Sequence, residues 1–261
     1  MVWLIGAKPE KRQWYVNIFN DMDVDWEAIV NTRDTVKEAS FIKSVIPRRG
    51  VTLDLCCGTG RHSIILCKKG FDVIGMDLSK NLLAIAKRRV SESGVKFPLV
   101  RADMRHFPFK SEVFKAIVNM FTSFGYLPSE GEDGKSLLEI CRTLKKNGKF
   151  LLDVSNRDYI VRNFRERDWA EFEPYYLLER RALDLENSRL ASQWTLVRKG
   201  RGKTRSIMHE VRLYTLTRIE QLLKEAGLVI EEVYGGYEKQ EFNLDASRMI
   251  VLAQKQYVGG A

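Results

Sequence analysis

The sequence predicts a doubly wound α/β sheet that carries a small antiparallel β insertion. From residue 51 onward, short apolar runs alternate with helical stretches, which is typical of parallel strands joined by right-handed crossovers. After Ser155 this rhythm gives way to segments of alternating polar and apolar residues, and it returns near residue 216. The 261 residues therefore divide into an N-terminal helical cap (1–50), an α/β core (51–156), an antiparallel insertion (157–215) and the completion of the core (216–261).

The N-terminal cap is predicted from helical spacing. Apolar residues recur three and four positions apart between Trp26 and Val45, as in a helix that packs one face against a core. The sequence PRRG at residues 47–50 ends this helical part.

The core begins with a strand and a glycine turn that leads into a helix. Ser79 is predicted to be the N-cap of the next helix, because a serine side chain can accept hydrogen bonds from the first turn. Gly148 is predicted to close the last helix before the fifth strand. The expected strands are residues 51–56, 71–77, 96–103, 114–121 and 149–155, and the expected helices end near residue 69 and span residues 80–93 and 133–148.

The insertion is predicted to be an antiparallel meander. Its three segments, residues 175–185, 189–199 and 205–216, are separated by the turn sequences ENS and GRGK. A helix over residues 217–228 and a hairpin of two strands, residues 229–237 and 247–255, then complete the core.

The charge balance leaves two interpretations open. A formal net charge of +9 and a pI of about 9.3 favour an anionic partner such as RNA or a lipid head group. The enrichment in Lys, Arg and Glu also fits a thermophilic source. The basic residues lie in small groups near expected helix ends and turns, where cations are favourable in any case, and the densest group is residues 198–205.

Membrane and metal-binding proteins are disfavoured. No run of eighteen apolar residues exists, and the N-terminus lacks the pattern of a signal peptide, so we expect a cytoplasmic protein with no membrane span. The four cysteines (Cys56, Cys57, Cys67 and Cys141) form no CxxC pair. We therefore expect neither a metal site nor a disulfide framework.

Polar and glycine residues follow the strands at one edge of the predicted sheet, where ligands bind in doubly wound folds. Gly58 and Gly60 allow a tight turn and a close approach of backbone to a ligand. Asp77 lies nineteen positions after Gly58, the spacing of a carboxylate that accepts hydrogen bonds from a ribose diol. No further glycine occurs before Gly70, so the G-x-G-x-x-G pattern of dinucleotide sites is absent. A ligand without phosphate fits this turn better.

Five segments resemble the successive motifs of class I S-adenosylmethionine-dependent methyltransferases: LDLCCGTGRH, VIGMDLS, RADMRHFPF, FKAIVNMFTSFGYL and LKKNGKFLLDVSN. The resemblance covers residues 51–156 and implies a Rossmann-like, seven-stranded sheet whose last strand is antiparallel. By its layout, the insertion is similar to that of the small-molecule branch, the glycine-N-methyltransferase-like proteins. The sequence departs from the usual Gly-x-Gly-x-Gly at Cys56, which replaces the first glycine.

The resemblance also implies roles for the cofactor residues. The turn would lie under the methionine part of S-adenosylmethionine, the residues after the second and third strands would hold the ribose and adenine, and the N-terminal cap would cover the cofactor and bind its carboxylate. The implied cofactor-binding residues are Asp54, Gly58, Thr59, Gly60, Asp77, Leu78, Asp103, Met104 and Asn119 (through its backbone), with Trp26 and Arg33 from the cap.

For the methyl acceptor, we expect a small molecule that is methylated on nitrogen or oxygen beneath the insertion. Methyl transfer from a sulfonium is an in-line displacement that depends on positioning and on exclusion of water. The candidate catalytic residues are His209, Tyr126 and Arg212, and His209 is the candidate for a titrating group.

Two alternatives to a small-molecule methyltransferase stay open. The first is an RNA methyltransferase that uses residues 198–205 as an electrostatic contact, and the second is a protein that binds S-adenosylmethionine without catalysis. The Asn/Asp-Pro-Pro-aromatic motif of base or glutamine methylation is absent, since residues 119–122 read NMFT. The sequence defines neither the acceptor's identity nor the oligomeric state.

Overall fold

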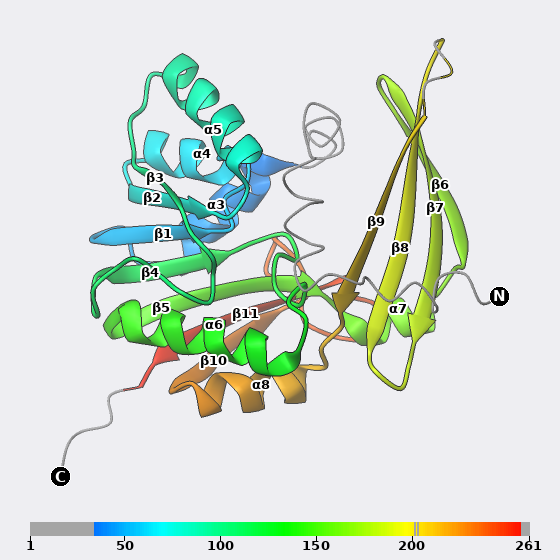
Figure 1. The fold of residues 1–261 in the computed structure, drawn as a ribbon. Helices are drawn as coiled ribbons and strands as arrows, with labels where there is room; N and C mark the ends of the chain where they lie inside the picture. The colour runs from blue at the N-terminus through cyan, green and yellow to red at the C-terminus, as the bar shows by residue number, and fades with distance from the viewer. Residues whose placement is uncertain (1–33, 201, 203, 257–261) are drawn as a thin grey trace.

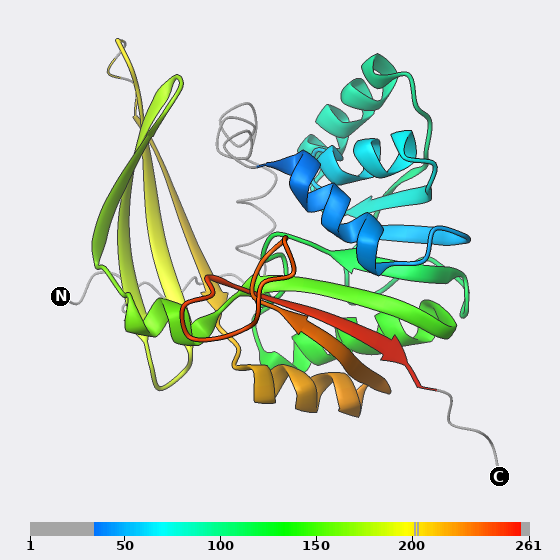
Figure 2. The same cartoon turned by 180° about the vertical axis from the view of Figure 1, so that it is seen from behind.

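The computed structural model describes residues 34–200, 202 and 204–256. These residues form two sheets that stand side by side (Figures 1 and 2). The larger sheet has the order β10-β11-β5-β4-β1-β2-β3. Its strands are β1 (Val51–Leu55), β2 (Asp72–Asp77), β3 (Leu99–Arg101), β4 (Phe114–Asn119), β5 (Leu144–Ser155), β10 (Leu228–Tyr234) and β11 (Arg248–Lys255).

Strand directions confirm the predicted topology of the larger sheet. Strands β1 to β5 are mutually parallel, whereas β11 pairs antiparallel with both β5 and β10. The parallel strands alternate with helices, so their C-terminal ends meet at one edge, as the sequence predicts.

Helices cover both faces of this sheet (Figure 1). On one face, Ile42 of α3 (Thr35–Val45) and Leu66 of α4 (Arg61–Lys68) pack with Val118 of β4. On the other face, α6 (Glu130–Thr143) and α8 (Leu216–Glu225) bury Leu137 and Leu222 against the sheet. Helix α5 (Lys80–Ser93) follows β2 and is capped by Ser79, whose Oγ accepts a hydrogen bond from the Leu82 N–H at 3.1 Å. This confirms the predicted N-cap.

The insertion is the predicted antiparallel meander, with one strand more than the sequence indicated. Its order is β6-β7-β8-β9, formed by β6 (Arg167–Phe172), β7 (Tyr175–Asp184), β8 (Arg189–Arg198) and β9 (Thr204–Arg212). Strand β6 escaped prediction because five of its six residues are charged or exposed and leave no apolar alternation. The short helix α7 (Arg157–Arg162), with Asn156 as its N-cap, was also not predicted.

The expected helix end at Gly148 is wrong. Helix α6 ends at Thr143, and β5 begins at the next residue. Leu144 is fully buried and lies opposite Phe114 of β4, so burial of this leucine in the sheet outweighs the helical tendency of the residues that follow.

Candidate functional site

A cavity of about 380 Å³ lies between the C-terminal edge of the larger sheet and the inner face of the insertion. One half is lined by the glycine turn after β1 and by the residues that follow β2, β3 and β4. The other half is lined by residues of β7, β8 and β9, together with Tyr126 and Ile160. We call these the turn half and the insertion half.

The glycine turn is fixed by the carboxylate at the end of β2. The Gly58 N–H donates to one oxygen of Asp77 at 2.8 Å, and the Ser79 N–H donates to the other oxygen at the same distance. Gly58 has φ of +55°, in the left-handed region that glycine adopts without strain. Burial raises the pKa of Asp77, and the two N–H donors oppose that rise. The carboxylate is thus positioned at the cavity wall, with lone pairs left for a ligand hydroxyl.

Most of the predicted cofactor-binding residues line this half. Asp103 and Met104 follow β3, as predicted. Burial acts to raise the pKa of Asp103, but the hydrogen bonds and charge of Arg105 outweigh it, so this pKa lies below its usual range. The predicted residues that line the turn half are Asp54, Gly58, Thr59, Asp77, Leu78, Asp103 and Met104.

Of the other four predicted residues, two do not line the described part of the cavity and two lie outside the described residues. Gly60 is the N-cap of α4, and a Cβ atom added there would lie 3.4 Å from the Ala86 Cβ, so it serves helix packing. The Asn119 side chain is fully buried and donates to the Leu55 carbonyl at 3.0 Å, which joins β4 to β1. Trp26 and Arg33 lie outside the described residues.

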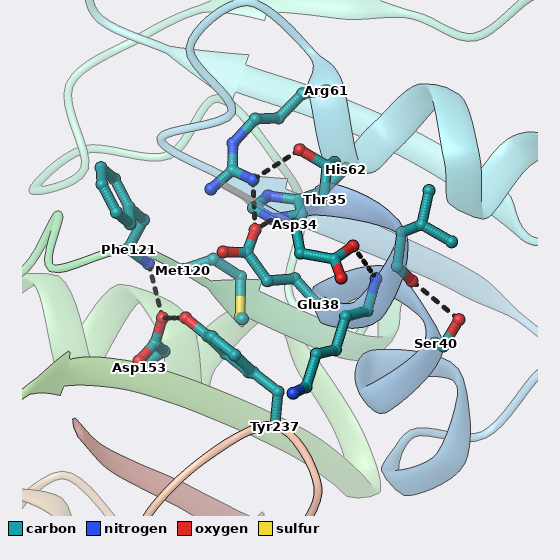
Figure 3. A network of polar contacts seen from close by, with 12 residues as sticks. Asp34, Thr35, Glu38, Ser40, Arg61, His62, Met120, Phe121, Asp153 and Tyr237 are labelled. Carbon is teal, nitrogen blue, oxygen red and sulfur yellow. Dashed lines mark hydrogen bonds and ion pairs between the residues drawn. The ribbon is translucent and has the colours of Figure 1, made fainter. Parts of the chain in front are cut away.

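Arg61, the first residue of α4, also reaches the cavity, although the sequence does not predict it as a site residue. Its Nη1 donates to Thr35 Oγ1 at 2.9 Å and contacts the carboxylate of Glu38 (Figure 3). Its buried Nη2 has no hydrogen-bond partner in the described part of the chain. Arg61 directly follows the Gly-Thr-Gly turn, and this position was the signal available in the sequence.

Glu38 holds Arg61 in place. Its carboxylate also lies 2.7 Å from His62 Nε2 (Figure 3). Burial acts to raise the pKa of Glu38, but the hydrogen bond of His62 and the charge of Arg61 lower it below its usual range. An ionised, buried Glu38 therefore orients the guanidinium and leaves Nη2 for a ligand.

The paired cysteines are part of the turn, where the Cys57 N–H donates to the Met76 carbonyl. Cys56 has φ of +59°, which is unusual for a residue with a side chain. Burial and the carboxylates of Asp77 and Asp54 raise the pKa of both the Cys56 and the Cys57 thiol well above the usual value. Protonated thiols are poor nucleophiles and poor metal ligands. The described residues contain no group of three or more His, Cys, Asp or Glu side chains arranged around a metal ion.

In the insertion half, His209 faces the cavity from β9. Its ring lies 4.3 Å from the Trp194 ring and 6.4 Å from the Tyr126 ring, between centroids. Its buried Nδ1 has no hydrogen-bond partner among the described residues. Burial lowers the pKa of His209 to about 4, so the imidazole is uncharged near pH 7. Burial also raises the pKa of Tyr126 to about 12, so its hydroxyl keeps its proton.

The third candidate catalytic residue, Arg212, is not among the described cavity-lining residues. Strand alternation turns it away from the face that carries His209 and Val211. Its Nη1 donates to the buried Asp133 at 2.6 Å, and the Tyr214 hydroxyl donates to the same oxygen at 2.6 Å. Arg212 thus joins the insertion to the start of α6 instead of facing a ligand.

The basic hairpin turn does not present Lys199 as a free cation. The Lys199 Nζ lies 2.7 Å from Glu171 and 2.6 Å from Glu173. Arg201 and Lys203 lie outside the described residues. Of the helices that the structure describes, none is long and apolar enough to cross a membrane.

Known proteins with the same features were found by sequence and by structure. Residues 52–148 match a family model described as a methyltransferase domain. YqeM of Bacillus subtilis (strain 168), whose name calls it a methyltransferase and states no substrate, is 30% identical over 218 residues, which cover 82% of this chain and 88% of YqeM. The glycine/sarcosine N-methyltransferase of Parasynechococcus marenigrum (strain WH8102) is 32% identical over 168 residues, 60% of this chain and 58% of that protein.

The fold matches as well. The structure of the CcbJ methyltransferase from Streptomyces caelestis superposes with a TM-score of 0.80 at 16% identity, over 92% of this chain and 98% of that one. The sheet order, the glycine turn and the carboxylate at the end of β2 define an S-adenosylmethionine-dependent methyltransferase fold. The chain belongs to the class I S-adenosylmethionine-dependent methyltransferases, as its motifs predict.

Proposed function

We propose that this protein transfers the methyl group of S-adenosylmethionine to an amine nitrogen of a small molecule bound in the insertion half of the cavity. The observation that carries the proposal is one continuous cavity in which a carboxylate-lined turn half meets a partly apolar insertion half. The relative from Parasynechococcus marenigrum, a glycine/sarcosine N-methyltransferase, supports nitrogen as the acceptor atom.

The turn half offers groups that match S-adenosylmethionine. Asp77 would accept hydrogen bonds from the ribose hydroxyls, and Asp103 would accept one from the adenine amino group. The Nη2 of Arg61 is a buried donor without a described partner, so the methionine carboxylate would complete its hydrogen bonding. When bound, S-adenosylmethionine supplies a methyl group that its sulfonium activates for displacement.

The protonation states of His209 and Tyr126 favour an amine over an alcohol as the methyl acceptor. An alcohol must lose its proton as it is methylated, and a base with a pKa of about 4, such as His209, is weak. The Tyr126 hydroxyl, whose pKa is about 12, stays protonated and is not available as a base near pH 7. A neutral amine already carries its lone pair, so these residues need only orient it and exclude water.

The experiment has two stages. Calorimetry with S-adenosylhomocysteine measures whether the turn half binds the product of the methyl donor, and absence of heat would contradict the proposal. Incubation with tritiated-methyl S-adenosylmethionine and a metabolite extract then measures transfer, and we expect the label in a small basic molecule.

The same experiment separates the alternatives. Label in added total RNA would instead support an RNA methyltransferase, and binding without transfer would support a non-catalytic protein. A cytoplasmic location and a thermophilic source stay predictions from the sequence.

A further inference from the structure

Three polar side chains form one row across the inner face of the insertion. Arg181 of β7 lies opposite Ser192 of β8, which lies opposite His209 of β9. All three line the cavity. Toward the core, the next row is apolar and consists of Leu183, Leu190 and Val211. A polar row beside an apolar one is costly to desolvate unless a ligand or water completes its hydrogen bonds.

Two side-chain nitrogen atoms of this row lack hydrogen-bond partners among the described residues. The Nε of Arg181 and the Nδ1 of His209 are buried, and neither has a hydrogen-bond partner within the described residues. The Arg181 Nε–H can only donate, so the ligand atom facing it must accept. The uncharged imidazole can accept at one nitrogen and donate at the other. A hydroxyl group meets either demand, because it can accept from Arg181 or donate to His209.

The charge around Arg181 disfavours an anionic ligand group. Its Nη2 lies 2.9 Å from the Asp168 carboxylate and 3.6 Å from that of Glu179. An incoming carboxylate or phosphate would meet these two carboxylates beside a guanidinium whose charge is already compensated. The neutral His209 adds no positive charge. An uncharged oxygen avoids this repulsion and still fills the donor position of Arg181.

We propose that the row Arg181–Ser192–His209 binds an uncharged hydroxyl group of the methyl acceptor, so that the acceptor is a hydroxylated amine, of the amino alcohol or amino sugar type, without a carboxylate or phosphate. The proposal rests on the proposed function and adds the substrate class to it. Trp194, one row further out, covers the carbon skeleton of such a molecule with its ring.

The test first separates candidate acceptors by their charge and then determines whether the methylated acceptor carries a hydroxyl group. A metabolite extract is separated by anion exchange at pH 7, and each fraction is incubated with the protein and tritiated-methyl S-adenosylmethionine. We expect the label in the unretained fraction, on an amine whose tandem mass spectrum shows a hydroxyl group. Label in the retained, anionic fraction would overturn this inference and leave the proposed function standing, as would a labelled amine without a hydroxyl.

Failure of the proposed function looks different. If S-adenosylhomocysteine does not bind, or if no fraction is labelled, the proposed function and this inference both fall.

Variants then connect the row to the hydroxyl. With the labelled amine and its deoxy analogue as substrates, His209→Phe is expected to lower kcat/KM for the hydroxylated amine at least tenfold more than for the deoxy analogue. Met208→Phe, at the exposed neighbouring position on the outer face of β9, is the matched control. Equal losses on both substrates would overturn the role of the row, and unchanged S-adenosylhomocysteine affinity shows that the variants are folded.

Discussion

The two halves of the cavity are built in different ways. In the turn half, short loops after parallel strands satisfy their own polar groups, as where Asp77 accepts from the backbone of Gly58 and Ser79. In the insertion half, the polar groups come from three separate strands, and His209 and Arg181 each keep a buried nitrogen without a described partner. The turn half is held mainly by backbone hydrogen bonds and leaves the Nη2 of Arg61 to a ligand, whereas the insertion half leaves buried nitrogens on two of its three strands. This contrast suits a shared cofactor beside a specific acceptor.

The largest effect is expected from removal of the Asp77 carboxylate, which fixes the glycine turn. Asp77→Ala removes the acceptor for two backbone N–H groups and for the ribose, and hydrogen bonds to a charged group contribute about 1.5–3 kcal/mol each. We expect S-adenosylhomocysteine affinity to fall about 100-fold, or about 3 kcal/mol, by calorimetry. Asp72→Ala, at the exposed start of the same strand, is the control. Wild-type affinity in Asp77→Ala would show that this carboxylate does not bind the cofactor.

The next prediction concerns Asp133, which joins the insertion to α6 through Arg212 and Tyr214. Burial raises the pKa of Asp133 to about 6, against the hydrogen bonds of Tyr214 and the charge of Arg212. A carboxyl whose pKa is raised on folding binds its proton more tightly when folded, so its contribution to stability falls as pH rises from about 4 to about 6. Asp133→Asn mimics the protonated form and removes this dependence.

We compare the free energy of unfolding of Asp133→Asn with that of wild type at each pH. We expect the variant's value, relative to wild type, to be about 2 kcal/mol higher at pH 7 than at pH 4.5, which means that the variant is relatively more stable at pH 7. Urea unfolding of both proteins at the two pH values measures it. Glu130→Gln, which removes a half-buried carboxylate whose pKa is lowered beside Arg218, is expected to shift the difference the other way. A pH-independent difference for Asp133→Asn would contradict the assignment.

The contrast between the halves also explains what the sequence could predict. The positions of Asp77, Ser79 and Asp103 can be predicted because each lies at the end of an apolar strand or within two residues after it, so local order alone brings them to one edge. Arg181 and Ser192 were not found, because their alignment with His209 depends on the register of two hairpins. Helical spacing and alternation describe single elements, whereas a row of side chains belongs to three strands at once.

Arg61 shows the limit within the turn half itself. It stands beside Gly60 in the sequence, yet its role depends on Glu38 and Thr35 of α3, more than twenty residues away. A positive charge in the first turn of a helix is ordinarily unfavourable next to the helix dipole. An arginine at this unfavourable position therefore indicates a functional residue, although residue spacing and composition do not reveal it.

Arg61→Leu tests the carboxylate contact with a smaller expected effect. Loss of one charge-assisted hydrogen bond corresponds to about 1.5 kcal/mol, so S-adenosylhomocysteine affinity should fall about tenfold. The affinity for methylthioadenosine, which lacks the amino-acid part, should stay unchanged. A parallel fall for both ligands would mean that Arg61 supports the fold of the turn through Glu38, and would remove it from the list of cofactor contacts.

The smallest effect is expected at Cys56, where the turn departs from the glycine pattern. A residue with a side chain at φ of +59° carries a strain of about 1 kcal/mol that glycine avoids. Against this, Cys56→Gly loses the contact of Sγ with Met104 Sδ at 4.0 Å and gains flexibility when unfolded. These terms nearly cancel in the free energy of folding, so the turn should keep its conformation. We therefore expect calorimetry to give S-adenosylhomocysteine affinity within about twofold of wild type.

Cys57→Gly, by contrast, removes a side chain buried between β1 and β2 and should lower the free energy of unfolding by about 1–2 kcal/mol. A loss of cofactor binding in Cys56→Gly alone would mean that the thiol itself contacts the ligand, and the turn half would then rely on a second side chain, besides Arg61, to hold the cofactor.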